Sequence, residues 1–181
     1  MPRKSILLSS MISVLMLSGN AIAAETGTID FVGEITDTTC NVFVGNDDSG
    51  AATITLPSVQ MRNLGANGSE SGTEAFSLRL DCSGSEANVA ISFDETVNTT
   101  ETGGRLTNTA PDGADGVSLI LRDGDNNPVD VNTYISNTFE FAGGESAEQS
   151  YNYTVQYYVE DADALTPGEV SAQVTYNLTY Q

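Results

Sequence analysis

The chain has no histidine and no tryptophan, and only two cysteines and six basic residues among its 181 residues. A serine nucleophile would therefore lack its usual histidine base. A pair of carboxylates, as in glycoside hydrolysis, is the one catalytic arrangement left open. Nothing in the sequence singles out such a pair among the 25 acidic residues. We therefore expect no catalytic residue, no cofactor and no enzymatic activity.

The N-terminus has the pattern of a secretory signal. Arg3 and Lys4 precede an apolar run from Ile6 to Leu17, and Ala21-Ile22-Ala23 then places small residues where a signal peptidase cleaves. A membrane-spanning helix needs about 20 apolar residues, so this run is short for a retained anchor, which is the alternative. We predict that residues 1–23 are removed and that the rest is exported without inserting into a membrane.

The predicted mature chain, residues 24–181, is strongly acidic. It keeps four arginines and no lysine against 25 acidic residues, a net charge of about −21. Such a charge repels nucleic acid and anionic lipid. The acidic residues are spread along the chain, which argues against a disordered acidic tail and favours solubility over a dedicated acidic site.

The two cysteines, Cys40 and Cys82, both follow the signal. In an oxidising compartment a lone pair of cysteines predicts one disulfide. Closing a loop of about 42 residues stabilises a fold by roughly 4 kcal/mol in the loop-entropy account. Two free thiols in a metal site are the alternative, but no histidine or further cysteine could complete that site.

Alternation of apolar and polar residues with a period of two dominates the mature chain. Clusters rich in glycine, asparagine and aspartate separate the alternating segments and are typical of turns. This pattern predicts one all-β domain, an antiparallel sandwich, over residues 39–181. The predicted strands are Thr53 to Leu56, Ala75 to Cys82, Ala87 to Phe93, Val117 to Leu121, Thr138 to Phe141, Tyr151 to Val159 and Val170 to Tyr180.

Both ends of the mature chain are unusual for a self-sufficient sandwich. The chain ends on its most regular alternating segment, Val170 to Tyr180, and no later segment covers the edge of that strand. A second alternating segment, with Ile29, Phe31 and Ile35 on one face, follows the cleavage site without an obvious partner. Exposed edges invite a strand from another chain. A fold that lacks one strand and carries a spare strand is suited to polymerisation.

Each end of the mature chain carries a short motif. Near the N-terminus, an aromatic residue is followed by glycine, an aliphatic residue and the first cysteine, here Phe31, Gly33, Ile35 and Cys40. Near the C-terminus, a tyrosine is penultimate and a glycine is fourteenth from the end, here Tyr180 and Gly168. These motifs resemble those of the chaperone–usher pilins, the subunits of type 1 and P fimbriae. The resemblance extends over essentially the whole mature chain and is closest to shaft-type subunits.

The resemblance implies an incomplete immunoglobulin-like antiparallel β-sandwich that lacks its last strand and is completed by donor-strand exchange. Residues 24–38 would be the donor extension, with Ile29, Phe31 and Ile35 entering a groove and Gly33 allowing close backbone approach. A periplasmic chaperone would fill the groove first, and an outer-membrane usher would exchange it for the next subunit. The groove and chaperone-binding strand would comprise Gly168, Val170, Ala172, Val174, Tyr176, Leu178 and Tyr180.

The segment Asp123-Gly124-Asp125-Asn126-Asn127 has the alternating oxygen ligands of a calcium loop. It lacks the glycine at the sixth position and the distal glutamate of an EF-hand. We therefore predict a hairpin turn there, with cation binding as the alternative.

Three functions remain for comparison. The first is a structural pilin, in the shaft or as a minor adaptor, that supports adhesion at the cell surface. The second is an adhesive module that binds a surface ligand directly, although the chain has no room for an additional lectin domain. The third is a self-complete secreted sandwich.

Overall fold

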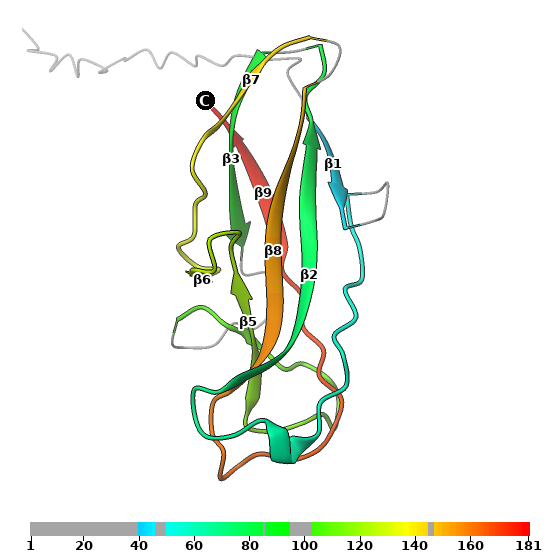
Figure 1. Cartoon of the computed structure of the whole chain (residues 1–181), viewed down its shortest axis with the longest axis vertical. Helices are drawn as coiled ribbons and strands as arrows, with labels where there is room; N and C mark the ends of the chain where they lie inside the picture. The colour runs from blue at the N-terminus through cyan, green and yellow to red at the C-terminus, as the bar shows by residue number, and fades with distance from the viewer. Residues whose placement is uncertain (1–39, 46–49, 85, 95–102, 145–146) are drawn as a thin grey trace, which may run out of the picture. The chain divides into compact units, whose positions relative to one another are not determined.

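The computed structural model describes residues 40–45, 50–84, 86–94, 103–144 and 147–181 (Figure 1). These all belong to the second of two compact units, which spans residues 36–181. The donor residues Ile29, Phe31, Gly33 and Ile35 and the signal segment lie outside the described residues.

The larger sheet is antiparallel and has the order β1-β2-β8-β5-β4, with β6 also paired to β5. Two long neighbours of 12 residues each, β2 and β8, form its centre, and inward apolar residues alternate with outward polar ones from Phe76 in β2 and from Tyr151 in β8. Its strands are β1 (Asn41–Val44), β2 (Glu70–Asp81), β4 (Leu106–Thr107), β5 (Val117–Arg122), β6 (Pro128–Val129) and β8 (Glu148–Val159).

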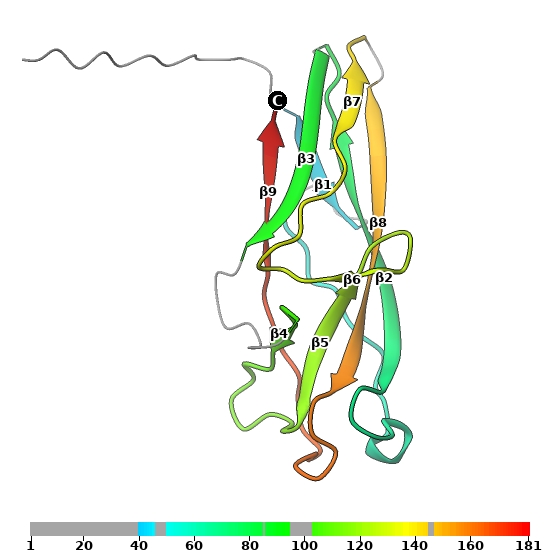
Figure 2. The same cartoon turned by 90° about the vertical axis from the view of Figure 1, so that its left-hand side faces the viewer.

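The smaller sheet has the order β7-β3-β9 and is also antiparallel. It consists of β3 (Glu86–Asp94), β7 (Phe139–Ala142) and β9 (Thr175–Tyr180). Figure 2 separates β3 and β9 on the left from β2 and β8 on the right. The described residues therefore form the all-β antiparallel sandwich that the alternation predicts. The one helical element among them is a short 3₁₀ turn, η1 (Met61–Asn63).

The core lies between the two sheets. Leu78 and Leu80 of β2 and Val89 and Ile91 of β3 are almost completely buried. The ring of Tyr153, on β8, meets the ring of Phe93, on β3, edge-on, with centroids 5.3 Å apart. Aromatic pairs in this geometry add to the stabilisation from burial, so this contact joins the end of β3 to the middle of β8 across the core.

Most predicted strands are confirmed, and two predictions need correction. Residues Thr53 to Leu56 belong to no strand, although Ile54 and Leu56 face the core as expected. The predicted strand Val170 to Tyr180 is a regular strand only over Thr175–Tyr180. Its first half bonds instead to residues 108–114, through backbone groups and through the side chains of Asn108 and Thr109. The sequence analysis also missed the short strands β1, β4 and β6.

The segment between β5 and β6 is a hairpin turn, as predicted. The Asp123 carboxylate accepts hydrogen bonds from the backbone N–H groups of Asp125 and Asn127, at 3.0 and 2.8 Å. Asn126 adopts the left-handed conformation, with φ of 65°. Nowhere in the described part of the chain do acidic or cysteine side chains cluster as a metal site would require.

No helix within the described ranges is long and apolar enough to cross a membrane.

Candidate functional site at the open edge of the sandwich

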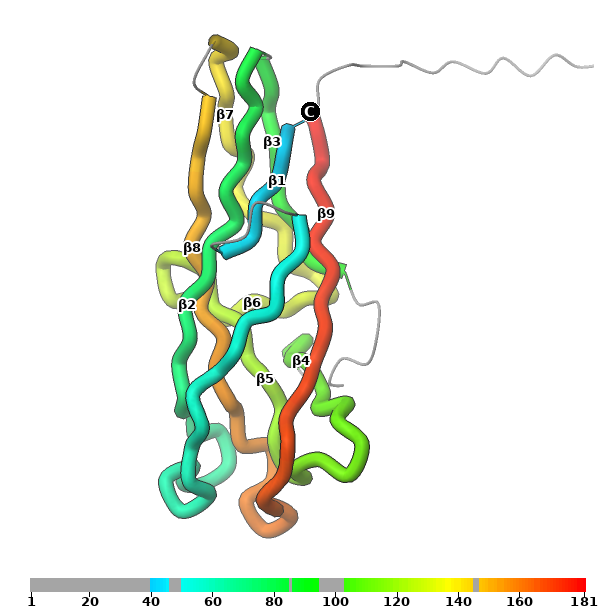
Figure 3. Tube along the Cα trace, turned by 90° about the vertical axis from the view of Figure 1, so that its right-hand side faces the viewer, coloured from blue at the N-terminus to red at the C-terminus, as the bar shows by residue number. Residues whose placement is uncertain are grey.

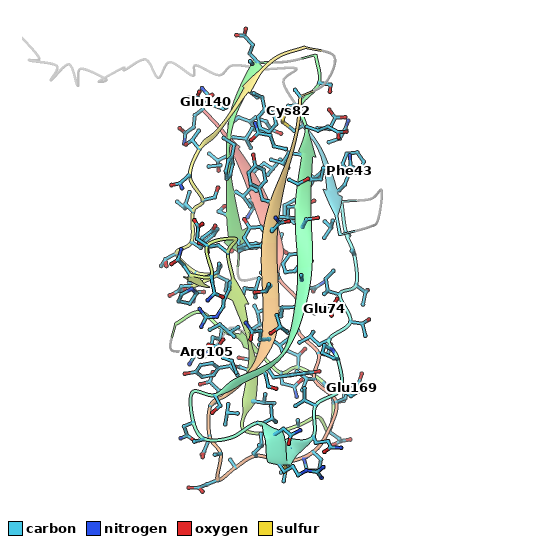
Figure 4. The ribbon with its side chains drawn as sticks, viewed as in Figure 1. Phe43, Glu74, Cys82, Arg105, Glu140 and Glu169 are labelled. Carbon is cyan, nitrogen blue, oxygen red and sulfur yellow. A yellow bond between two sulfur atoms is a disulfide. The ribbon has the colours of Figure 1, made fainter. Side chains whose placement is uncertain are left out.

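Cys40 and Cys82 form a disulfide, as predicted. Cys82 is buried and follows β2, and Cys40 directly precedes β1. Figure 4 shows Cys82 at the upper end of the sandwich and Glu169 toward its lower end. The candidate site extends between these two ends.

We use the term open edge for the side of the sandwich bounded by residues 50–60 and by residues 168–180. Figure 3 shows these two segments as the cyan and red tubes, which lie close together at the upper end of the cyan segment and diverge below it. Residues 50–60 follow β1, the outermost strand of the larger sheet, and residues 168–180 end in β9, the outermost strand of the smaller sheet. The chain that leaves the edge of the larger sheet therefore forms one boundary, and the segment that ends in the edge strand of the smaller sheet forms the other.

The inward row of the last segment is apolar but incompletely covered. Every second residue is half-buried and packs against the core, and the residues between are exposed. None of the row reaches the near-complete burial of Leu80 or Val89. Apolar side chains that contact the core yet remain partly exposed indicate that no element of the described part of the chain fully covers the core on this side. The row consists of Val170, Ala172, Val174, Tyr176 and Leu178.

The other boundary has the same character. Ile54 and Leu56 also pack against the core and are half-buried, and Val59 is half-buried further along. Together the two rows present apolar surface from both sheets to one side. Within the described strands, β9 pairs with β3 and with no other strand.

Gly168 begins the last segment where the backbone must pass very close to another loop. A Cβ atom at this position would lie 2.4 Å from the backbone nitrogen of Ala114 and 2.5 Å from the carbonyl carbon of Gly113. Any other residue would clash with the backbone there. The glycine that the sequence analysis selected from the family pattern thus has a local steric role.

Asn108 then holds the segment in place. Its Nδ2 donates to the carbonyl oxygens of Ala114 and Glu169, at 2.8 and 2.9 Å. Its Oδ1 accepts from the N–H of Ser171 at 2.9 Å. These bonds lie on the side away from residues 50–60, so the opposite side of the segment remains directed toward the open edge. The sequence analysis did not identify Asn108, because a single side chain acting over about 60 residues produces no periodic pattern.

Two tyrosines of β9 reach across the open edge at the end nearest the disulfide. The Tyr176 hydroxyl donates to the carbonyl oxygen of Gly50 at 2.7 Å. The Tyr180 hydroxyl accepts from the N–H of Cys40 at 3.0 Å. Burial raises the pKa of Tyr176 above its ordinary value, so this hydroxyl remains a donor throughout the neutral range.

Comparison with known proteins identifies the family. The sequence pattern of the family described as "Fimbrial protein" matches residues 29–181. The chain belongs to the fimbrial protein family. Two similar relatives are Long polar fimbria protein A of Salmonella typhimurium, 33% identical over 93% of each chain, and the F17 fimbrial protein of Escherichia coli, 30% identical over 91% of this chain and 92% of its own.

Solved structures agree on the fold. The crystal structure of the P pilus rod subunit PapA matches with a TM-score of 0.58 over 78% of this chain and 99% of its own, at 18% identity. The chain is thus a fimbrial subunit with the fold of the chaperone–usher pilins, as the resemblance implied. Because the relatives are structural subunits, the expectation that this fimbrial subunit is not an enzyme is confirmed.

Proposed function

We propose that this fimbrial subunit polymerises by donor-strand exchange, with the open edge as the acceptor groove. The observation that carries the proposal is the half-exposed apolar row of residues 170–178 beside a strand that pairs, among the described strands, only with β3. A strand inserted between residues 50–60 and β9 would cover both apolar rows and bond to the backbone of β9. Strand addition to an exposed sheet edge supplies affinity through the backbone and specificity through alternate side chains.

The donor in this proposal is residues 24–38 of the next copy, freed by removal of residues 1–23. The alternation in the sequence places Ile29, Phe31 and Ile35 on one face. Each of these side chains would contribute about 1.5–3 kcal/mol when fully buried. Gly33 lies on the same face and would let the two backbones approach closely where the groove is shallow.

We also propose two assembly partners, a chaperone and an usher. A subunit with a half-exposed core needs protection before assembly, because exposed apolar edges aggregate. A periplasmic chaperone that lends a strand to the edge would supply this protection, and an outer-membrane usher would direct the exchange at the cell surface. We propose that this subunit forms the shaft, since one domain that combines donor and acceptor can repeat without limit.

The proposal is tested with a synthetic peptide that spans Thr26 to Thr36. Added at about 100 times its dissociation constant, a ligand of the folded state stabilises it by about 2.7 kcal/mol. For a domain of this size, that corresponds to a rise in melting temperature of roughly 5–10 °C. The control peptide carries serine in place of Phe31 and Ile35 and should leave the melting temperature unchanged. A protein that is already stable and does not respond to the native peptide would show a self-complete sandwich.

The proposed place in the shaft is tested by imaging fibres with an antibody against this chain. Labelling along the whole length supports a shaft subunit. Labelling confined to fibre ends identifies a minor or adaptor subunit instead.

A further inference from the structure

The open edge is bridged at one end and open at the other. The bonds from Tyr176 to Gly50 and from Cys40 to Tyr180 both lie toward the disulfide. Between Gly168 and Val174, by contrast, the bonds of the last segment run to residues 108–114, on the far side from residues 50–60. The hydroxyl of Tyr176 thus lies at the boundary between a closed half and an open half.

The lengths of the two halves can be compared with the strand that the groove would accept. A β-strand rises about 3.3 Å per residue, so the open half from Val170 to Val174 measures roughly 13 Å. The inward donor positions from Ile29 to Ile35 extend over roughly 20 Å on the same scale. On the same scale Tyr176 lies roughly 20 Å from Val170, so a fully inserted donor reaches Tyr176, whose hydroxyl bond crosses its path.

There is little space for a side chain at Gly50, the acceptor of this bond. A Cβ atom at residue 50 would lie 3.0 Å from the Tyr176 hydroxyl oxygen, which is tighter than ordinary van der Waals contact. Gly50 does not adopt a left-handed conformation, so alanine could take its place without backbone strain. A side chain at residue 50 would therefore crowd the Tyr176 hydroxyl without straining the backbone.

We propose that the hydrogen bond between Tyr176 and Gly50 is a latch that closes the disulfide-proximal half of the acceptor groove, and that an incoming donor strand must break it to insert fully. This inference rests on the proposed function of the open edge and adds a rate-controlling residue to it. The bond is accessible to solvent, so water can replace it as it opens and the barrier it adds is modest. The latch delays insertion without preventing it.

The test is the rate at which the folded chain takes up a fluorescent peptide spanning Thr26 to Thr36. One neutral hydrogen bond contributes about 0.5–1.5 kcal/mol, so Tyr176→Phe should take up the peptide roughly 2- to 10-fold faster than the unmodified chain. Gly50→Ala disturbs the same bond from the acceptor side and should accelerate uptake in the same direction. Melting curves of both variants establish that they remain folded.

Tyr151→Phe is the matched control. This variant removes the hydroxyl that donates a hydrogen bond to Gln149 at 2.7 Å. The Tyr151 ring packs against Phe139 of β7, and β7 and β9 lie at opposite edges of the smaller sheet. Its uptake rate should equal that of the unmodified chain. Faster uptake by both Tyr176→Phe and Gly50→Ala, but not by the control, supports the latch.

Two results would overturn the latch in distinguishable ways. If all chains take up the peptide and the Tyr176 and Gly50 variants match the control or are slower, the latch is wrong while the acceptor groove stands. If no chain takes up the peptide, the proposed function fails and the latch fails with it.

Discussion

Arg105 and Glu160 form a two-pronged ion pair. The Arg105 Nε lies 2.6 Å from Oε1 of Glu160, and its Nη2 lies 2.8 Å from Oε2. The hydroxyl of the buried Ser118 donates to the same carboxylate at 2.6 Å, and the guanidinium stacks over the ring of Tyr158. Burial alone raises the pKa of Glu160, but the hydrogen bonds from Arg105 and Ser118 outweigh it and hold this pKa below the ordinary value. The group ties the start of β4 to β5 and to the end of β8.

Glu160→Gln should destabilise the domain by about 1–3 kcal/mol at pH 7, because it leaves the Arg105 charge without its carboxylate. A carboxylate whose pKa is lowered on folding stabilises the fold above its unfolded pKa, and this contribution is lost as the pH falls through the folded value. The difference in unfolding free energy between variant and parent should therefore shrink below about pH 4.5, the ordinary pKa of a glutamate side chain. Urea denaturation at several pH values measures it. Glu140→Gln, at an exposed position on β7, is the control and should show little effect at any pH.

Removal of the disulfide should cost about 4 kcal/mol, since the bridge closes a loop of 42 residues. The double variant Cys40→Ala/Cys82→Ala should melt at a lower temperature than the parent. Reductant should lower the melting temperature of the parent toward that of the variant. The variant itself should be insensitive to reductant. Two alkylatable thiols in the unreduced parent would contradict the bridge.

Gly33→Asn, which tests the proposed donor, should abolish fibre assembly while leaving the acceptor intact. The added side chain would hold the donor backbone away from a shallow part of the groove. The variant should still gain thermal stability from the peptide spanning Thr26 to Thr36, and electron micrographs should show no fibres. Glu34→Gln, on the opposite face of the donor, should assemble normally. Normal fibres from the Gly33 variant would show that close backbone approach at this residue is not needed for the donor to insert.

Val174→Ala should cost little in the unfilled subunit and more once the peptide is bound. Val174 is half-exposed, whereas Val129 in β6 is almost completely buried. The control variant Val129→Ala loses buried apolar surface in the core and should lower the free energy of unfolding by roughly 1.5–3 kcal/mol whether or not peptide is present. Melting curves of the two variants with and without peptide measure the difference. An equal response of both sites to the peptide would show that Val174 does not line the binding edge.

Regular alternation was a reliable guide wherever a strand is long. In β2, β3 and β8 the alternating side chains decide which face is buried, so sequence and structure agree. The short strands β4 and β6 contain two residues each, too few for a period to be read. At Thr53 to Leu56, the alternation indicated correctly that Ile54 and Leu56 face the core. It could not show that the backbone there pairs with no strand.

The candidate site was only partly predictable for a related reason. The alternation from Val170 to Leu178 can be read as a period of two, and in the structure these apolar side chains pack against the core. The bond between Tyr176 and Gly50 joins residues 126 positions apart and depends on where the chain runs after β1. Asn108 likewise bonds residues of the last segment that lie 61 and 63 positions away. Such contacts arise from the tertiary arrangement, and no local pattern encodes them.

The disulfide also determines how a pulling force would enter the domain. Every residue before Cys40 is connected to the sandwich through that residue, and β1, the strand that follows, is a four-residue strand at the edge of its sheet. Tension applied to the N-terminal extension would tend to peel such a strand away, one hydrogen bond after another. The bond from Cys40 to Cys82 carries the load covalently to the end of β2, in the interior of the larger sheet. The resistance of the domain to unfolding from this end would then depend on the long β2–β8 pair and not on β1.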